Sequence, residues 1–95
     1  MNEYELVYIL QPELEEDEMT TLNERISQII SDEEGSISST ELWGKRRLAY
    51  PIRNYYEGTY ILHNVSMPPG AVQNVERLLR LSEDVIRFLV VRAED

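Results

Sequence analysis

The apolar residues of this chain switch between strand-like and helical spacing four times along the sequence, and this alternation constrains the fold more than any other feature. Segments rich in aromatic and β-branched residues, as in strands, alternate with segments whose apolar residues recur at steps of three and four, as on one side of a helix. The strand-like segments are residues 4–10, 36–53, 59–65 and 84–92. The helical stripes consist of Met19, Leu22, Ile26, Ile29 and Ile30, and of Val72, Val75, Leu78 and Leu79. The predicted order is strand, helix, strand, strand, helix, strand.

This order predicts an α+β fold of the ferredoxin-like type. Two split βαβ units with right-handed crossovers place four strands in one antiparallel sheet with both helices on one face. The first and third strands are then central and the second is an edge, which suits Pro51 because proline donates no hydrogen bond to a neighbouring strand. A chain of 95 residues buries only about two thirds of its unfolded surface, so we expect a single domain spanning residues 1–95.

Glycines mark the expected irregularities of the chain. Gly44 interrupts the strand pattern of residues 36–53, which predicts a β-bulge that re-aims the side chains after it. Residues 54–58 are predicted to connect this strand to the next, with Gly58 taking a positive φ. Gly35 follows the first helix and is expected to end it.

Residues 44–53 form a strongly basic stretch in an otherwise acidic protein. Its cations are Lys45, Arg46, Arg47 and Arg53. Clustered cations attract polyanions without any nucleophile or tuned acid and base, so the stretch is a candidate phosphate-binding surface. Cations on an edge strand also prevent unwanted pairing with another chain. The charge alone is compatible with both interpretations.

The distribution of charge limits the kinds of nucleic-acid binding that are open to the chain. The net charge is −9, which argues against a general nucleic-acid binder because such proteins neutralise phosphates with many cations. Residues 1–41 contain twelve acidic residues and one basic residue, a net −11, whereas residues 42–95 contain six acidic and eight basic residues, a net +2. If the fold also separates these charges in space, the protein presents a basic surface to RNA and turns its acidic side away.

Residues that could support catalysis or bind a metal are sparse. There is no cysteine, and His63, the only histidine, has no sequence-local carboxylate, which favours a hydrogen-bonded strand histidine over a general base. The acidic residues 13–18 complement the dipole of the first helix and show no cation-binding loop motif. We therefore expect no enzymatic activity, no catalytic residue, no metal, no cofactor and no small-molecule substrate.

No segment predicts export or insertion into a membrane. The N-terminal segment is acidic where a secretory signal carries bases, and no apolar run approaches the roughly 18 to 20 residues of a membrane span. The absence of cysteine suits a reducing compartment. We expect a cytoplasmic protein.

The sheet face away from the helices is expected to carry an apolar patch. Strand alternation places these side chains there: Val7, Ile9, Tyr60, Leu62, Leu89 and Val91. Their combined area, on the order of several hundred Å², is at or above what monomers usually expose, which predicts a partner. The alternative is a monomer with scattered exposed apolar side chains.

The basic stretch GKRRLAYPIR at residues 44–53 closely resembles the signature of the bacterial small-subunit ribosomal protein S6 family. The resemblance extends over nearly the whole chain and includes Tyr4-Glu5, Glu57-Gly58, Met67-Pro68 and Val90-Val91-Arg92. It implies a ferredoxin-like fold, a place in the ribosome, and a role in assembling the central domain of the small subunit. It also implies binding to small-subunit ribosomal RNA as a heterodimer with ribosomal protein S18, and no catalysis.

The resemblance also implies site residues. Residues that match basic positions of the family are expected to contact RNA: Lys45, Arg46, Arg47, Arg53, Arg80, Arg87 and Arg92. The open sheet face and its margins, rather than the family motif, supply the expected partner contacts: Val7, Ile9, Tyr50, Tyr60, Leu62, Leu89 and Val91. Which arginines face RNA and which face the partner stays open. The sequence stops at Ala93-Glu94-Asp95, without the longer tail of many members, and Glu3 is acidic where an RNA-facing residue could be basic, so no tail contact is expected.

Two other functions remain as alternatives. An RNA-recognition module has the same order of elements and stacks bases on aromatic residues of its central strands, where Tyr60 is suitably placed, but residues 58–63 lack the aromatic pairing of that motif. A non-catalytic sensing domain of the same fold would instead cover its open sheet with a second copy of itself.

Overall fold

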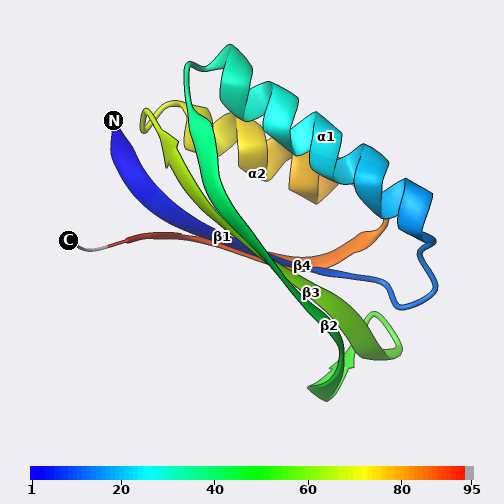
Figure 1. The fold of residues 1–95 in the computed structure, drawn as a ribbon. Coiled ribbons are helices and arrows are strands. Elements are labelled where there is room, and N and C mark those ends of the chain that lie inside the picture. The colour runs from blue at the N-terminus through cyan, green and yellow to red at the C-terminus, as the bar shows by residue number, and fades with distance from the viewer. Residues whose placement is uncertain (94–95) are drawn as a thin grey trace.

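The computed structural model describes residues 1–93 and shows a four-stranded antiparallel sheet with two helices on one face (Figure 1). The elements are β1 (Asn2–Leu10), α1 (Glu16–Asp32), β2 (Ser36–Ile52), β3 (Tyr55–Met67), α2 (Ala71–Leu81) and β4 (Val85–Arg92). The strand order is β2-β3-β1-β4, so β1 and β3 are central and β2 is an edge. The predicted fold class is confirmed. Glu94 and Asp95, where the sequence predicted no tail contact, lie outside the described residues.

The core lies between the helices and one face of the sheet. The predicted helical stripes supply Leu22, Ile26 and Ile30 from α1 and Val75, Leu78 and Leu79 from α2, all buried. They pack in one cluster with buried residues of the central strands: Leu6, Tyr8, Leu10, Ile61, Val65 and Met67. Met19, Ile29 and Val72 lie at the margin of this cluster. Apolar spacing in the sequence therefore identifies the residues that join helix to sheet.

The two ends of α1 have different local causes. At the start, the backbone N–H of Glu15 donates to the carboxylate of Glu18 at 3.4 Å, and the acidic side chains here are exposed, as expected of a helix cap. At the end, the residue with positive φ is Glu34, at 66°, rather than Gly35. Gly35 is required for space, because a Cβ there would lie 2.5 Å from the carbonyl oxygen of Ser66.

The turn between β2 and β3 is shorter than predicted. Arg53 and Asn54 alone form it, with φ of 49° and 69°, as a two-residue type I′ hairpin requires. The prediction of a positive φ at Gly58 is wrong, since Gly58 lies within β3 and is buried. Its lack of a side chain serves close packing instead, because a Cβ would lie 2.3 Å from Cγ2 of Ile9.

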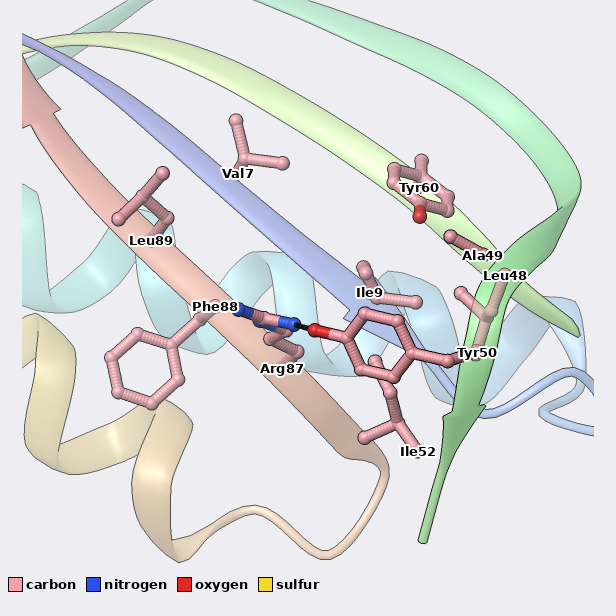
Figure 2. A pocket seen from close by; sticks show the side chains of 10 residues that line it. All are labelled: Val7, Ile9, Leu48, Ala49, Tyr50, Ile52, Tyr60, Arg87, Phe88 and Leu89. Atoms are coloured by element: carbon pink, nitrogen blue, oxygen red, sulfur yellow. Dashed lines mark hydrogen bonds between the residues drawn. The ribbon is translucent and has the colours of Figure 1, made fainter. Parts of the chain in front are cut away.

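β2 is irregular at more than one place. The predicted bulge is present, with Gly44 at φ 76° and a register shift between Leu42 and Gly44. Two further shifts, neither predicted, lie between Ile37 and Ser39 and between Arg47 and Ile52. Within the segment that follows Arg47, Leu48 is buried in a small cluster with Ile9 and Ile86. Leu48 and Ile9 lie on the side of the sheet that carries no helix (Figure 2). The end of the β2–β3 hairpin therefore folds against the face that the sequence predicted to be open.

A chain of hydrogen-bonded polar groups, with Tyr8 and His63 buried at its centre, links three strands to α1. Tyr8 donates to the amide oxygen of Asn23 on α1, Nε2 of His63 lies 2.8 Å from the Tyr8 hydroxyl, and Nδ1 lies 2.8 Å from the hydroxyl of Thr40. Because Tyr8 donates to Asn23, Nε2 of His63 carries the proton and Nδ1 accepts from Thr40. Burial lowers the pKa of His63 to about 4 and raises that of Tyr8. His63 is thus a neutral, hydrogen-bonded strand histidine.

Candidate RNA and partner interface

The cations of β2 lie on its two sides. Lys45 and Arg47 are paired with Thr59 and Glu57 of β3, whereas Arg46 is paired with Gly58. Paired residues share a sheet face and successive residues alternate, so Arg46 lies on the face without helices and the other two cations on the opposite side. All three side chains are exposed.

Trp43 positions one of these cations, although it was not among the residues predicted for the site. Its ring stacks on Tyr60 of β3, with centroids 6.1 Å apart and planes 14° apart. The guanidinium carbon of Arg46 lies 5.7 Å from the centroid of Trp43, within the range of a cation–π interaction. Only the bulge at Gly44, which re-aims the neighbouring side chains, could have indicated this arrangement. The stack holds Arg46 in place and occupies Tyr60, the residue that a base-stacking module would need.

Three further predicted arginines come together at the start of β4. Arg53 from the hairpin turn, Arg80 from α2 and Arg87 from β4 line one hollow of about 210 Å³, here called the arginine hollow. The rest of its lining is apolar: Leu79, Val85, Ile86 and Phe88. Arg92 does not join them, because it lies at the far end of β4, where it donates to the Asn2 side chain at 3.2 Å.

The face opposite the helices is only partly open. Ile9 and Leu62 are each 7% exposed, while Val7 and Tyr60 are half-buried. Leu89 and Val91 on β4 are 59% and 44% exposed. The predicted patch is therefore smaller than the sequence indicated, in part because the hairpin end brings Leu48 against Ile9.

A second hollow, of about 360 Å³, lies on this face beneath the hairpin end and is here called the apolar hollow (Figure 2). Its lining is mostly apolar and comes from all four strands: Val7, Ile9, Leu48, Ala49, Tyr50, Ile52, Tyr60, Arg87, Phe88 and Leu89. At its mouth, Arg87 donates to the Tyr50 hydroxyl, with its guanidinium carbon 6.0 Å from the centroid of the Tyr50 ring. Six of its residues are predicted partner or RNA contacts, so the structure brings the two predicted groups together here.

Other kinds of site find little support among residues 1–93. The carboxylates of Glu15, Asp17 and Glu18 lie within 4.8 Å of one another, but they are exposed and Glu18 caps α1. The described helices include none that is long and apolar enough to cross a membrane.

Comparison with known proteins agrees with this geometry. The family model for Ribosomal protein S6 matches residues 3–92. The small ribosomal subunit protein bS6 of Moorella thermoacetica is 40% identical over 95 residues, covering 100% of this chain and 97% of that protein. The bS6 protein of Desulforudis audaxviator is 40% identical over 94 residues, covering 99% of this chain and 100% of that protein.

Solved structures give the same result. The crystal structure of 30S ribosomal protein S6 from Thermotoga maritima superposes with a TM-score of 0.85 at 30% identity, over 97% of this chain and 87% of that one. The C-terminal domain of the MgtC protein from Mycobacterium tuberculosis has a TM-score of 0.66 at 14% identity over 99% of this chain and 89% of that one, which shows a shared fold alone. The family consists of ribosomal proteins rather than enzymes, in agreement with the prediction of no catalysis. The chain therefore belongs to the ribosomal protein S6 family of the small ribosomal subunit.

Proposed function

We propose that this protein binds small-subunit ribosomal RNA as a heterodimer with ribosomal protein S18, and so takes part in assembling the small subunit. One observation supports this most: the apolar hollow of β1–β4 shares Arg87 with the arginine hollow. A protein partner and an RNA strand can therefore meet at one continuous surface. The resemblance to the S6 family implies this same role, and the proposal is further supported by the match of the family model to residues 3–92.

The partner accounts for the unfavourable net charge. At −9, this chain repels a polyanion except near its clustered cations, so its own RNA affinity is expected to be weak. A basic protein seated on the apolar hollow would supply further phosphate contacts. Leu89 and Val91 would then lose their exposed surface, which favours association.

The proposal predicts a specific salt dependence for RNA binding by the heterodimer. RNA affinity falls as salt rises, and each lost phosphate contact reduces the steepness of this fall, the magnitude of the slope of log affinity against log salt, by about 0.7 to 0.9. This magnitude is here called the salt slope. We expect the double variant Lys45→Gln, Arg47→Gln to weaken binding to small-subunit RNA and to lower this slope in the presence of S18. The measurement is a filter-binding series across salt concentrations, with and without S18.

Arg25→Gln is the matched control, because Arg25 is an exposed cation on α1, in the helix layer. It is expected to leave the slope unchanged. Strong, salt-insensitive binding by the isolated chain, or equal effects of the double variant and Arg25→Gln, would contradict the proposal. A stable homodimer at low micromolar concentration in a mass measurement would instead favour the sensing-domain alternative.

A further inference from the structure

We infer that the arginine hollow binds a single phosphate group of the RNA backbone. The inference rests on the proposed function and specifies where and how one part of the RNA is held. It concerns Arg53, Arg80 and Arg87, which lie in the turn, in α2 and in β4, far apart in the sequence.

Each of the three guanidinium groups is already held by a contact within the protein. Nη1 of Arg53 donates to the carbonyl oxygen of Val85 at 3.3 Å. The guanidinium carbon of Arg80 lies 5.8 Å from the centroid of Phe88, and Arg87 donates to Tyr50. An arginine has five N–H donors, so each of these contacts leaves donors for a ligand. Less side-chain freedom is then lost on binding, which favours affinity.

The position of the hollow follows from the edge strand that it borders. β4 pairs with β1 on one side and has no strand on the other. Arg87 lies on the sheet face without helices, whereas Phe88 lies on the helix side (Figure 2). Arg80 of α2 places its guanidinium over the Phe88 ring. Arg53 reaches the first residue of β4 from the hairpin turn. The hollow therefore surrounds the outer edge of β4, which a nucleic-acid backbone can reach from solvent.

Size and charge select the ligand. At about 210 Å³ the hollow is smaller than the roughly 300 to 1,000 Å³ of small-molecule pockets, so it suits one group rather than a whole nucleotide. None of the described residues that line it is acidic. The carboxylate of Asp84, next in sequence to the lining, accepts from Nε2 of Gln11 at 3.3 Å. Three arginines line the hollow, and arginine binds phosphate oxygens through paired N–H groups.

Substitutions at Arg80 test the inference in the heterodimer bound to small-subunit RNA. We expect Arg80→Gln to weaken binding about tenfold and to lower the salt slope by about 1, as the loss of one phosphate contact does. Arg80→Lys is expected to restore the slope and only part of the affinity, because lysine keeps the charge without the paired donors. Arg53→Gln is expected to resemble Arg80→Gln.

Arg77→Gln is the matched control, since Arg77 is an exposed arginine on the same helix but outside the hollow. Its effect is expected to be less than twofold. Equal effects of Arg77→Gln and Arg80→Gln, in variants that melt at the wild-type temperature, would overturn the inference while leaving RNA binding by the wild type intact.

A second measurement separates this inference from the proposed function. Inorganic phosphate is titrated into the isolated chain while the arginine Nε–H signals are followed by NMR. We expect the signals of Arg53 and Arg80 to move and that of Arg77 to stay. If the wild-type heterodimer binds no RNA, the proposed function fails. If the signals of Arg53 and Arg80 do not move when phosphate is added, the inference about the hollow is overturned, whatever the heterodimer binds. If phosphate binds but the RNA affinities of the variants do not change, the hollow takes free phosphate and the assignment to RNA is overturned.

Discussion

Replacing Gly35 with alanine is expected to lower the free energy of unfolding by about 3 kcal/mol, at the upper end for overpacked sites. The added Cβ would lie 2.5 Å from the carbonyl oxygen of Ser66, 2.9 Å from Cβ of Met67 and 3.0 Å from Cγ2 of Ile30. The first of these atoms belongs to the backbone of β3, so α1 and β3 would have to separate. Urea unfolding followed by circular dichroism measures the change.

Gly70→Ala provides the control for this prediction. Gly70 has a φ of −66°, and no atom lies within 4 Å of the position that its Cβ would take. Alanine there is expected to leave stability unchanged or to raise it by about 0.4 to 1 kcal/mol, because it restricts the unfolded chain. Similar losses in the two variants would show that the contacts of Gly35 do not explain its effect.

Acidification is expected to destabilise the protein through His63. The pKa of His63 is about 4 in the folded protein, against an ordinary value of 6.5, because burial disfavours the charged imidazole. Below pH 6.5 the unfolded chain binds a proton that the native state excludes, so the stability that the neutral histidine contributes is complete above pH 6.5. It is lost as the pH falls from 6.5 to 4, by up to about 3 kcal/mol.

The difference in unfolding free energy between the wild type and His63→Gln isolates this contribution. The carboxylates are common to both proteins, so their contributions to the difference cancel. Within residues 1–93, the only other ionisable group hydrogen-bonded to the imidazole is the Tyr8 phenol, whose pKa burial raises, so it stays neutral. We expect the difference to shrink steadily from pH 7 to pH 4. A constant difference across this range would contradict the proposed burial of a neutral His63.

The fold was predictable because its main signals are local. Residues such as Leu22, Ile26 and Ile30 recur at helical spacing, and the same side chains are buried against the sheet. The handedness of crossover connections then leaves few ways to order the strands. The edge position of β2 and the bulge at Gly44 also follow from local sequence.

The site was less predictable because it depends on contacts between distant residues. The register shift after Arg47 brings Leu48 to Ile9. Pro51 in this segment suits an edge strand and a bulge equally, so it does not mark the shift as Gly44 marks the predicted bulge. Gly58 was assigned a conformational role because turn glycines often need positive φ, but the approach of Ile9 explains it. The resemblance to a family indicated that Arg53 and Arg80 matter, whereas only the fold shows that they share a hollow.

The pairing of β2 with β3 determines which cations a ligand can meet. Lys45 and Arg47 lie on one side of β2 and Arg46 on the other. A rigid ligand with one flat face can reach either Arg46 or the pair Lys45 and Arg47. An RNA that contacts all three cations must wrap around the outer edge of β2. A slip of one residue would exchange the two sets and move Arg46 away from Trp43. The bulge at Gly44 therefore sets the register of a charge pattern as well as the shape of a strand.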